Sequence, residues 1–290
     1  KMTSRRISGN RTAEDIVSEY YRQMQHAPKQ EERIIPPTIQ PPASADSSFI
    51  LSYDQFGREL ITKSNELFSG TAAEIPIKDK GEVSNMHMLK RLALTTAIYN
   101  NHQLSSTNIL PITPLQSEQL LKDGKLPKPS EYWEDLGLLL YDHNSNGINP
   151  KEAQALYSSL LNHHQELGLS IPDLEQKLLI VHAGLEKDSS YPRGVKPIVL
   201  PGLTRVHSPA VLSMTKTNHK FDYGLDQGVP FAASLGAGAR TLYMPAEDHI
   251  GLRLLCRGGA LGLDAWSRGL ASSGAGGRVN LARQGAPPKS

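Results

Sequence analysis

The strongest constraint on the fold is a series of six segments in which apolar residues recur every three or four positions. This spacing places the apolar side chains on one face of an α-helix. The predicted helices cover residues 53–68, 88–98, 115–122, 131–141, 153–161 and 174–185. Amphipathic helices joined by short polar connections bury their apolar faces against one another. The sequence therefore predicts a mainly α fold: a multi-helix domain with a smaller, irregular α+β C-terminal portion.

Changes in composition divide the chain into four parts. Residues 1–48 are predicted to be a flexible proline-rich N-terminal arm, and residues 49–188 the helical domain. Residues 189–256, of which 189–209 contain four prolines, are predicted to be an α+β portion packed on that domain, closed by a helix near residues 246–256. Residues 257–290 are rich in Gly, Ala and Arg without a clear period, which indicates a disordered tail.

Charge and composition exclude several classes of protein. The formal net charge is +2, so the whole chain carries no specific nucleic-acid signal. Cys256 is the only cysteine, which excludes an internal disulfide framework and a thiolate metal cluster. No apolar run approaches the roughly 20 residues of a membrane-spanning helix. We expect a cytoplasmic protein, or one secreted without a Sec signal peptide, that has a protein partner.

Residues 142–152 resemble the spacing of a calcium-binding loop. Asp142, Asn144 and Asn146 stand at alternate positions before Gly147, and Glu152 supplies a second carboxylate. Calcium prefers such oxygen ligands on a tight loop. The segment between Gly147 and Glu152 is one residue shorter than in a standard loop, and two carboxylates make a weak site. Ca2+ is therefore a minority prediction for this loop, and no other cofactor is expected.

The same loop has a purely structural interpretation, which the sequence favours. Asn149 is a good helix N-cap, Pro150 suits the first helical position, and Glu152 lies where a capping box places its acidic residue. On this interpretation the loop joins a helix at 131–141 to a helix that begins at Pro150.

The region 207–249 is the predicted place for any active site. His219 and Asp222 lie three residues apart and would share one face of a helix, which would orient the imidazole as a general base. His207 completes the candidate catalytic set. Cys256 follows among leucines and is interpreted as a buried apolar residue rather than a nucleophile.

Two functions follow from these patterns. The first is a soluble interaction or effector-type protein with a helical core, with weak cation binding at 142–152 as an addition. The alternative is a hydrolase- or transferase-like enzyme with its active site in 207–249. An enzyme would require a concave pocket where His207, His219, Asp222 or Glu247 converge to within about 3–4 Å of one another.

Overall fold

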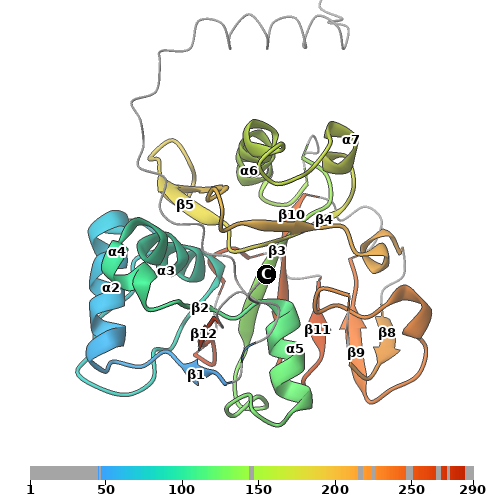
Figure 1. Cartoon of the computed structure of the whole chain (residues 1–290), viewed down its shortest axis with the longest axis horizontal. Helices are drawn as coiled ribbons and strands as arrows, with labels where there is room; N and C mark the ends of the chain where they lie inside the picture. The colour runs from blue at the N-terminus through green and yellow to red at the C-terminus, as the bar shows by residue number, and fades with distance from the viewer. Residues whose placement is uncertain are drawn as a thin grey trace, which may run out of the picture. The chain divides into compact units, whose positions relative to one another are not determined.

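A computed structural model of the chain describes residues 45, 47–143, 147–214, 218–223, 226–245, 251–265, 269–272 and 275–284. It is 30% helical and 25% strand, and its largest element is a mixed sheet. The prediction of a mainly α fold with a helical core is therefore wrong. Figure 1 shows the sheet running through the middle of the described part, with helices beside it.

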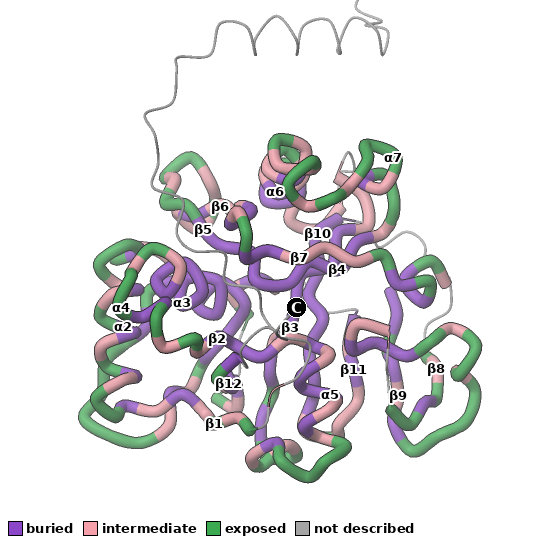
Figure 2. The backbone as a smooth tube through the Cα atoms, in the orientation of Figure 1, coloured by how far each residue is buried: buried purple, intermediate pink, exposed green. Residues whose placement is uncertain are grey.

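The large sheet has seven strands and is antiparallel except between β11 and β9. Its strands, in spatial order, are β7 (Arg205–His207), β4 (Leu178–Val181), β3 (Glu134–Leu140), β10 (Leu252–Arg257), β11 (Leu263–Asp264), β9 (Arg240–Tyr243) and β8 (Asn218–Phe221). The neighbours β4 and β10 are buried along their whole lengths, and β3 is buried except at the half-buried Asp135 (Figure 2). The centre of this sheet is therefore part of the core rather than an exposed surface.

Two smaller sheets join segments that are distant in the sequence. One has the order β1 (Phe49–Ile50), β12 (Asn280–Arg283) and β2 (Ile109–Pro111), and the other pairs β5 (Gly184–Lys187) with β6 (Val195–Ile198). The expected disordered tail after residue 257 thus contributes β11 and the central strand β12. Leu281 and Ala282 of β12 are fully buried, and this burial stabilises a segment that has little local preference for any structure.

Four of the six predicted helices are present at the expected places. The observed helices are α2 (Gln55–Phe68), α3 (Met88–Asn100), α4 (His102–Ser106), α5 (Pro114–Lys122), α6 (Pro150–His163) and α7 (Ile171–Leu174), with 3-10 turns η1 (Ala210–Ser213) and η2 (Ala232–Ser234). Local caps explain several starts: the Asp54 side chain accepts a hydrogen bond from the backbone of Gly57, and Thr113 forms a capping box with α5.

The remaining helix predictions are wrong because the segments form buried strands. Residues 131–141 contain β3 instead of a helix, and residues 174–185 contain the end of α7 followed by β4 and the start of β5. Within the predicted helix 246–256, residues 252–256 belong to β10, and residues 246–250 lie outside the described part. A short apolar run occurs in buried strands as well as in buried helices, so the spacing of apolar residues does not distinguish the two.

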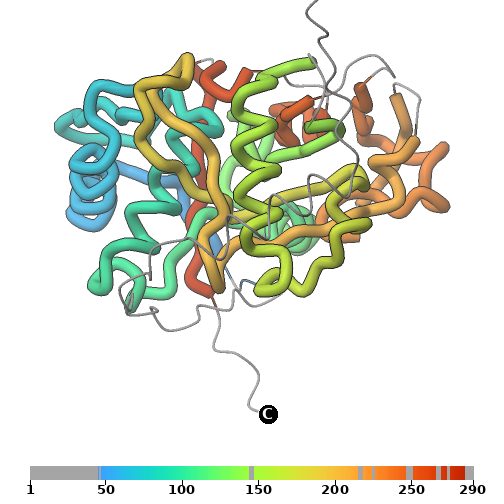
Figure 3. Tube along the Cα trace, turned by 90° about the horizontal axis from the view of Figure 1, so that it is seen from above, coloured from blue at the N-terminus to red at the C-terminus, as the bar shows by residue number. Residues whose placement is uncertain are grey.

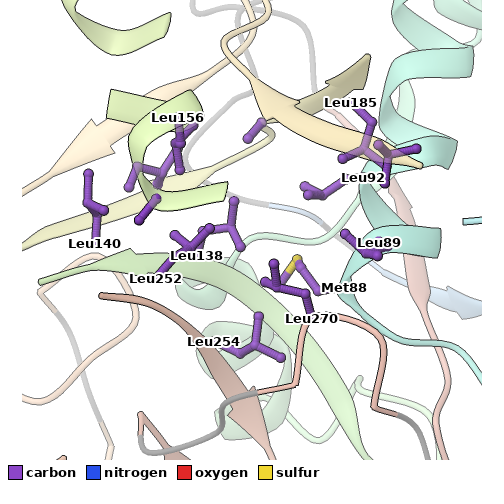
Figure 4. Close-up of a cluster of buried hydrophobic side chains, with 14 of the residues drawn as sticks. Met88, Leu89, Leu92, Leu138, Leu140, Leu156, Leu185, Leu252, Leu254 and Leu270 are labelled. Atoms are coloured by element: carbon purple, nitrogen blue, oxygen red, sulfur yellow. The ribbon is translucent and has the colours of Figure 1, made fainter. Parts of the chain in front are cut away.

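The large sheet separates two apolar clusters. On one face Leu138, Leu140, Leu252 and Leu254 pack with residues of α3 and α6, and Figure 4 shows Met88, Leu89, Leu92 and Leu156 approaching them. On the other face Leu139, Leu179 and Leu255 pack with residues of α5 and η1, namely Leu120, Val211 and Leu212. Seen from above, the fold extends from α2 and α3 at one side to β8 and β9 at the other (Figure 3). Among the described residues, no helix has the length and apolar character needed to span a membrane.

Candidate functional site

The predicted catalytic residues lie on strands at opposite edges of the large sheet. His207 ends β7 and His219 lies in β8, which are the first and last strands of the sheet order. Asp222 directly follows β8, and on an extended chain two side chains three positions apart point to opposite sides, whereas on the predicted helix they would share a face. The structure does not bring the three residues together.

Each of these residues has a local environment of its own. Asp222 accepts a hydrogen bond from the backbone N–H of Ala239 at 3.2 Å, and its carbonyl oxygen accepts one from Arg240 at 3.0 Å. Burial lowers the pKa of His207, and the nearby carboxylate of Asp226 opposes that shift. Asp222 therefore holds a turn beside β8.

The loop at 142–152 is arranged differently from either interpretation of its sequence. Helix α6 begins at Pro150, as predicted, but Asn149 is left-handed (φ 52°) and its side chain donates to the carbonyl of Leu252 at 2.8 Å. The Glu152 carboxylate is buried and pairs with Arg193 at 2.6 Å. The predicted capping box is therefore wrong.

The predicted calcium ligands are not gathered by what the structure describes. Asn144 and Asn146 lie outside the described residues, and Glu152 is engaged by Arg193. Across the described ranges, no group of three or more His, Cys, Asp or Glu side chains is placed to hold a metal ion. Calcium binding by Asp142 with this set of ligands stays a prediction without structural support.

A hollow of about 350 Å³ lies where β3 ends and α7 passes into β4. It is lined by Leu140, Tyr141, Asp142, His143, Leu174, Glu175 and Gln176. This volume is at the lower end of the range for small-ligand sites, about 300–1,000 Å³. Asp142 and Glu175 come from separate segments, and the antiparallel pairing of Leu140 with Leu178 brings those segments together.

Aromatic rings and carboxylates lie in the lining of the hollow and beside it. The imidazole of His143 stacks on the ring of Tyr157 from α6, with parallel planes and centroids 3.3 Å apart. The Tyr157 hydroxyl donates to a carboxylate oxygen of Glu175 at 2.7 Å. The ammonium of Lys177 lies 5.3 Å from the centroid of the Tyr141 ring, a cation–π distance.

The protonation states of these groups follow from burial and hydrogen bonding. Burial lowers the pKa of His143 despite the opposing effect of Glu175 and Asp142, so the imidazole is neutral at pH 7. Burial, followed by the bond to Glu175, raises the pKa of Tyr157 to about 12 and keeps its hydroxyl a donor. The lining holds two carboxylates, those of Asp142 and Glu175, and no lysine or arginine, which suits a positively charged guest.

The arrangement is suited to binding rather than to nucleophilic catalysis. Within the described residues, no hydrogen bond joins His143 to a hydroxyl or thiol that it could activate. Tyr141, Tyr157 and Glu175 were not singled out by the sequence. Only Asp142 was. The others were missed because residues 175–177 become neighbours of 141–143 through the pairing of β3 with β4, and no local sequence motif predicts that pairing.

Comparison of the chain with protein-family models, with curated proteins and with solved structures found no match.

Proposed function

We propose that this protein is a binding protein that takes a small organic cation, such as a primary ammonium, in the hollow between Asp142 and Glu175. The observation that carries the proposal is the presence of these two carboxylates in the lining of one hollow of about 350 Å³. Charge-assisted hydrogen bonds from an ammonium to carboxylates are about twice as strong as neutral ones. Aromatic faces add a cation–π contribution of about 0.5–2 kcal/mol.

An organic cation fits the described residues better than a metal ion does. Calcium takes six to eight oxygen ligands. One oxygen of Glu175 already accepts from Tyr157, and His143 is stacked on the Tyr157 ring. An ammonium needs only a few acceptors and tolerates ring faces around its alkyl part. This proposal retains the expectation of a binding protein and replaces Ca2+ with an organic cation, while a protein partner stays a prediction.

Calorimetry with n-butylammonium tests the proposal, with butyrate as the probe of equal size and opposite charge. A ligand this small is expected to bind with a Kd of about 1 mM, equal to about 4 kcal/mol. Glu175→Gln keeps the shape of the side chain and its acceptor for Tyr157 but removes one charge. The affinity should fall about tenfold in this variant, which corresponds to about 1.4 kcal/mol.

Glu166→Gln is the matched control, because Glu166 is an exposed carboxylate just beyond α6 that does not line the hollow. It should bind butylammonium as the wild type does. Equal heats from butylammonium and butyrate, or an unchanged affinity in Glu175→Gln, would contradict the proposal. Saturable binding of Ca2+ in place of butylammonium would return the site to the calcium interpretation.

A further inference from the structure

Three adjacent strands place two carboxyl groups and the single thiol of the chain in one row. Cys256 of β10 pairs with Asp135 of β3 on one side and with Asp264 of β11 on the other. Residues directly opposite one another in a sheet project to the same face, with Cβ atoms about 4.5–5.5 Å apart. Asp135, Cys256 and Asp264 therefore stand side by side.

The row lies under the first turn of α3. Leu254, two residues before Cys256 on β10, packs on the same face in the cluster that contains Met88 and Leu89, and Figure 4 shows these side chains together. The Asp135 carboxyl accepts a hydrogen bond from the backbone N–H of Met88. Asp135 thus joins the start of the helix to the centre of the sheet.

The surroundings of Asp135 oppose its negative charge. The residue is half-buried, but its Oδ2 atom is shielded from solvent and has no hydrogen-bond partner among the described residues. Burial raises the pKa of Asp135 to about 7, and the carboxylates of Glu134 and Asp264 act in the same direction. Arg91 of α3 and the Met88 N–H oppose the shift, and Arg91 also faces Glu134.

We propose that Asp135 is a proton-operated latch for the N-terminal turn of α3. In its neutral form Asp135 adds no charge to a row that already contains Asp264, and the turn stays closed on the sheet. In its ionised form it carries a charge with one shielded, unpartnered oxygen. Opening of the turn hydrates that oxygen, so a rise in pH through neutrality favours the open form.

Cys256 reports the opening directly. It is the only cysteine of the chain, it is 4% exposed, and it lies next to Asp135 in the row. Burial raises the pKa of the Cys256 thiol, so the closed form reacts slowly with a disulfide reagent such as DTNB. The rate of this reaction therefore measures the fraction of open molecules, after correction for the pH dependence of thiol ionisation.

The experiment compares the DTNB reaction rates of the full-length wild type and Asp135→Asn at pH 6 and pH 8. Each rate is divided by that of the same protein unfolded in urea at the same pH, which corrects for thiol ionisation. A carboxyl that ionises near pH 4 when open and near pH 7 when closed changes the opening constant about tenfold between these pH values. From pH 6 to pH 8, the corrected rate of the wild type divided by that of Asp135→Asn should rise about tenfold. Asp123→Asn, a change at an exposed position, should behave as the wild type.

An equal pH dependence in wild type and Asp135→Asn would overturn the latch. If Asp135→Asn does not fold, the carbon-13 signal of the Asp135 carboxyl in the wild type decides the matter. A midpoint near pH 7 supports the proposal, whereas a midpoint near pH 4 refutes it.

Discussion

Replacement of Glu134 by glutamine tests the buried ionic network that joins β3 to α3 and β12. The Glu134 carboxylate is fully buried and lies 3.1 Å from a guanidinium nitrogen of Arg257 and 3.7 Å from one of Arg91. It also accepts hydrogen bonds from the backbone and side-chain nitrogens of Asn280, at 2.7 and 2.8 Å. Glutamine keeps the size of the side chain but removes the charge that balances two buried guanidinium groups.

The expected loss of stability follows from those contacts. Removal of one partner from a buried ion pair costs about 3–5 kcal/mol, because the other charge is left uncompensated. Arg257 also donates to the carbonyl of Pro129 at 2.6 Å, and Arg91 to the carbonyl of Ile112, and both bonds survive the substitution. We therefore expect a loss of stability at the lower end of this range, about 3 kcal/mol. That is a large part of the typical free energy of unfolding of about 5–15 kcal/mol.

Urea unfolding followed by circular dichroism measures this change as a shift in midpoint at constant slope. Glu131→Gln is the control, because Glu131 is an exposed neighbour with the same chemistry, and it should stay within about 0.5 kcal/mol of wild type. Arg257→Met in the Glu134→Gln background should recover part of the loss, since it removes one uncompensated charge. A loss below about 1 kcal/mol in Glu134→Gln would refute the reasoning.

Two further predictions concern acid stability and one loop glycine. Burial lowers the pKa of His87 and of His182 to about 4, so below pH 6.5 the unfolded chain takes up protons that the folded chain excludes. The free energy of unfolding should therefore fall by about 2 kcal/mol per histidine between pH 7 and pH 5. His182→Asn, in which asparagine tolerates the left-handed backbone at this position, should lower that pH-dependent loss by the contribution of one histidine. Gly251 has φ +108°, and an added Cβ would lie 2.4 Å from the carbonyl oxygen of Ile148. Gly251→Ala should therefore lower the free energy of unfolding, measured in urea, by more than about 2 kcal/mol, whereas Gly124→Ala, with φ +66° and open space around the added Cβ, should lower it by about 1 kcal/mol. Equal losses would contradict the steric argument.

Local signals predicted part of the fold correctly. Helices α2, α3, α5 and α6 appear where apolar spacing placed them, and α6 starts at Pro150 as expected. A helix closes its hydrogen bonds within one segment, so its spacing and caps are legible in that segment alone. The expected capping box was wrong, because Glu152 pairs with Arg193, whereas Pro150 occupies the first turn as expected.

The candidate sites divide in the same way. The spacing around Asp142 drew attention to the end of β3 where the hollow lies, but the second carboxylate in its lining is Glu175 rather than Glu152. His207 and His219 lie near one another in the sequence and were assigned to one predicted site, yet the strand order puts them at opposite edges of the sheet. No pattern within 207–249 contains that information.

The sequence by itself determined the amphipathic helices and the turn residues between them, since each depends on neighbours within a few positions. The tertiary structure alone decided that the leucine-rich runs of β3, β4 and β10 are strands, and that the tail supplies β12 between β1 and β2. It also decided which acidic residues line the same hollow. A strand makes its hydrogen bonds to other strands, so its partners, and the side chains it aligns with them, are chosen by contacts between residues far apart in the chain.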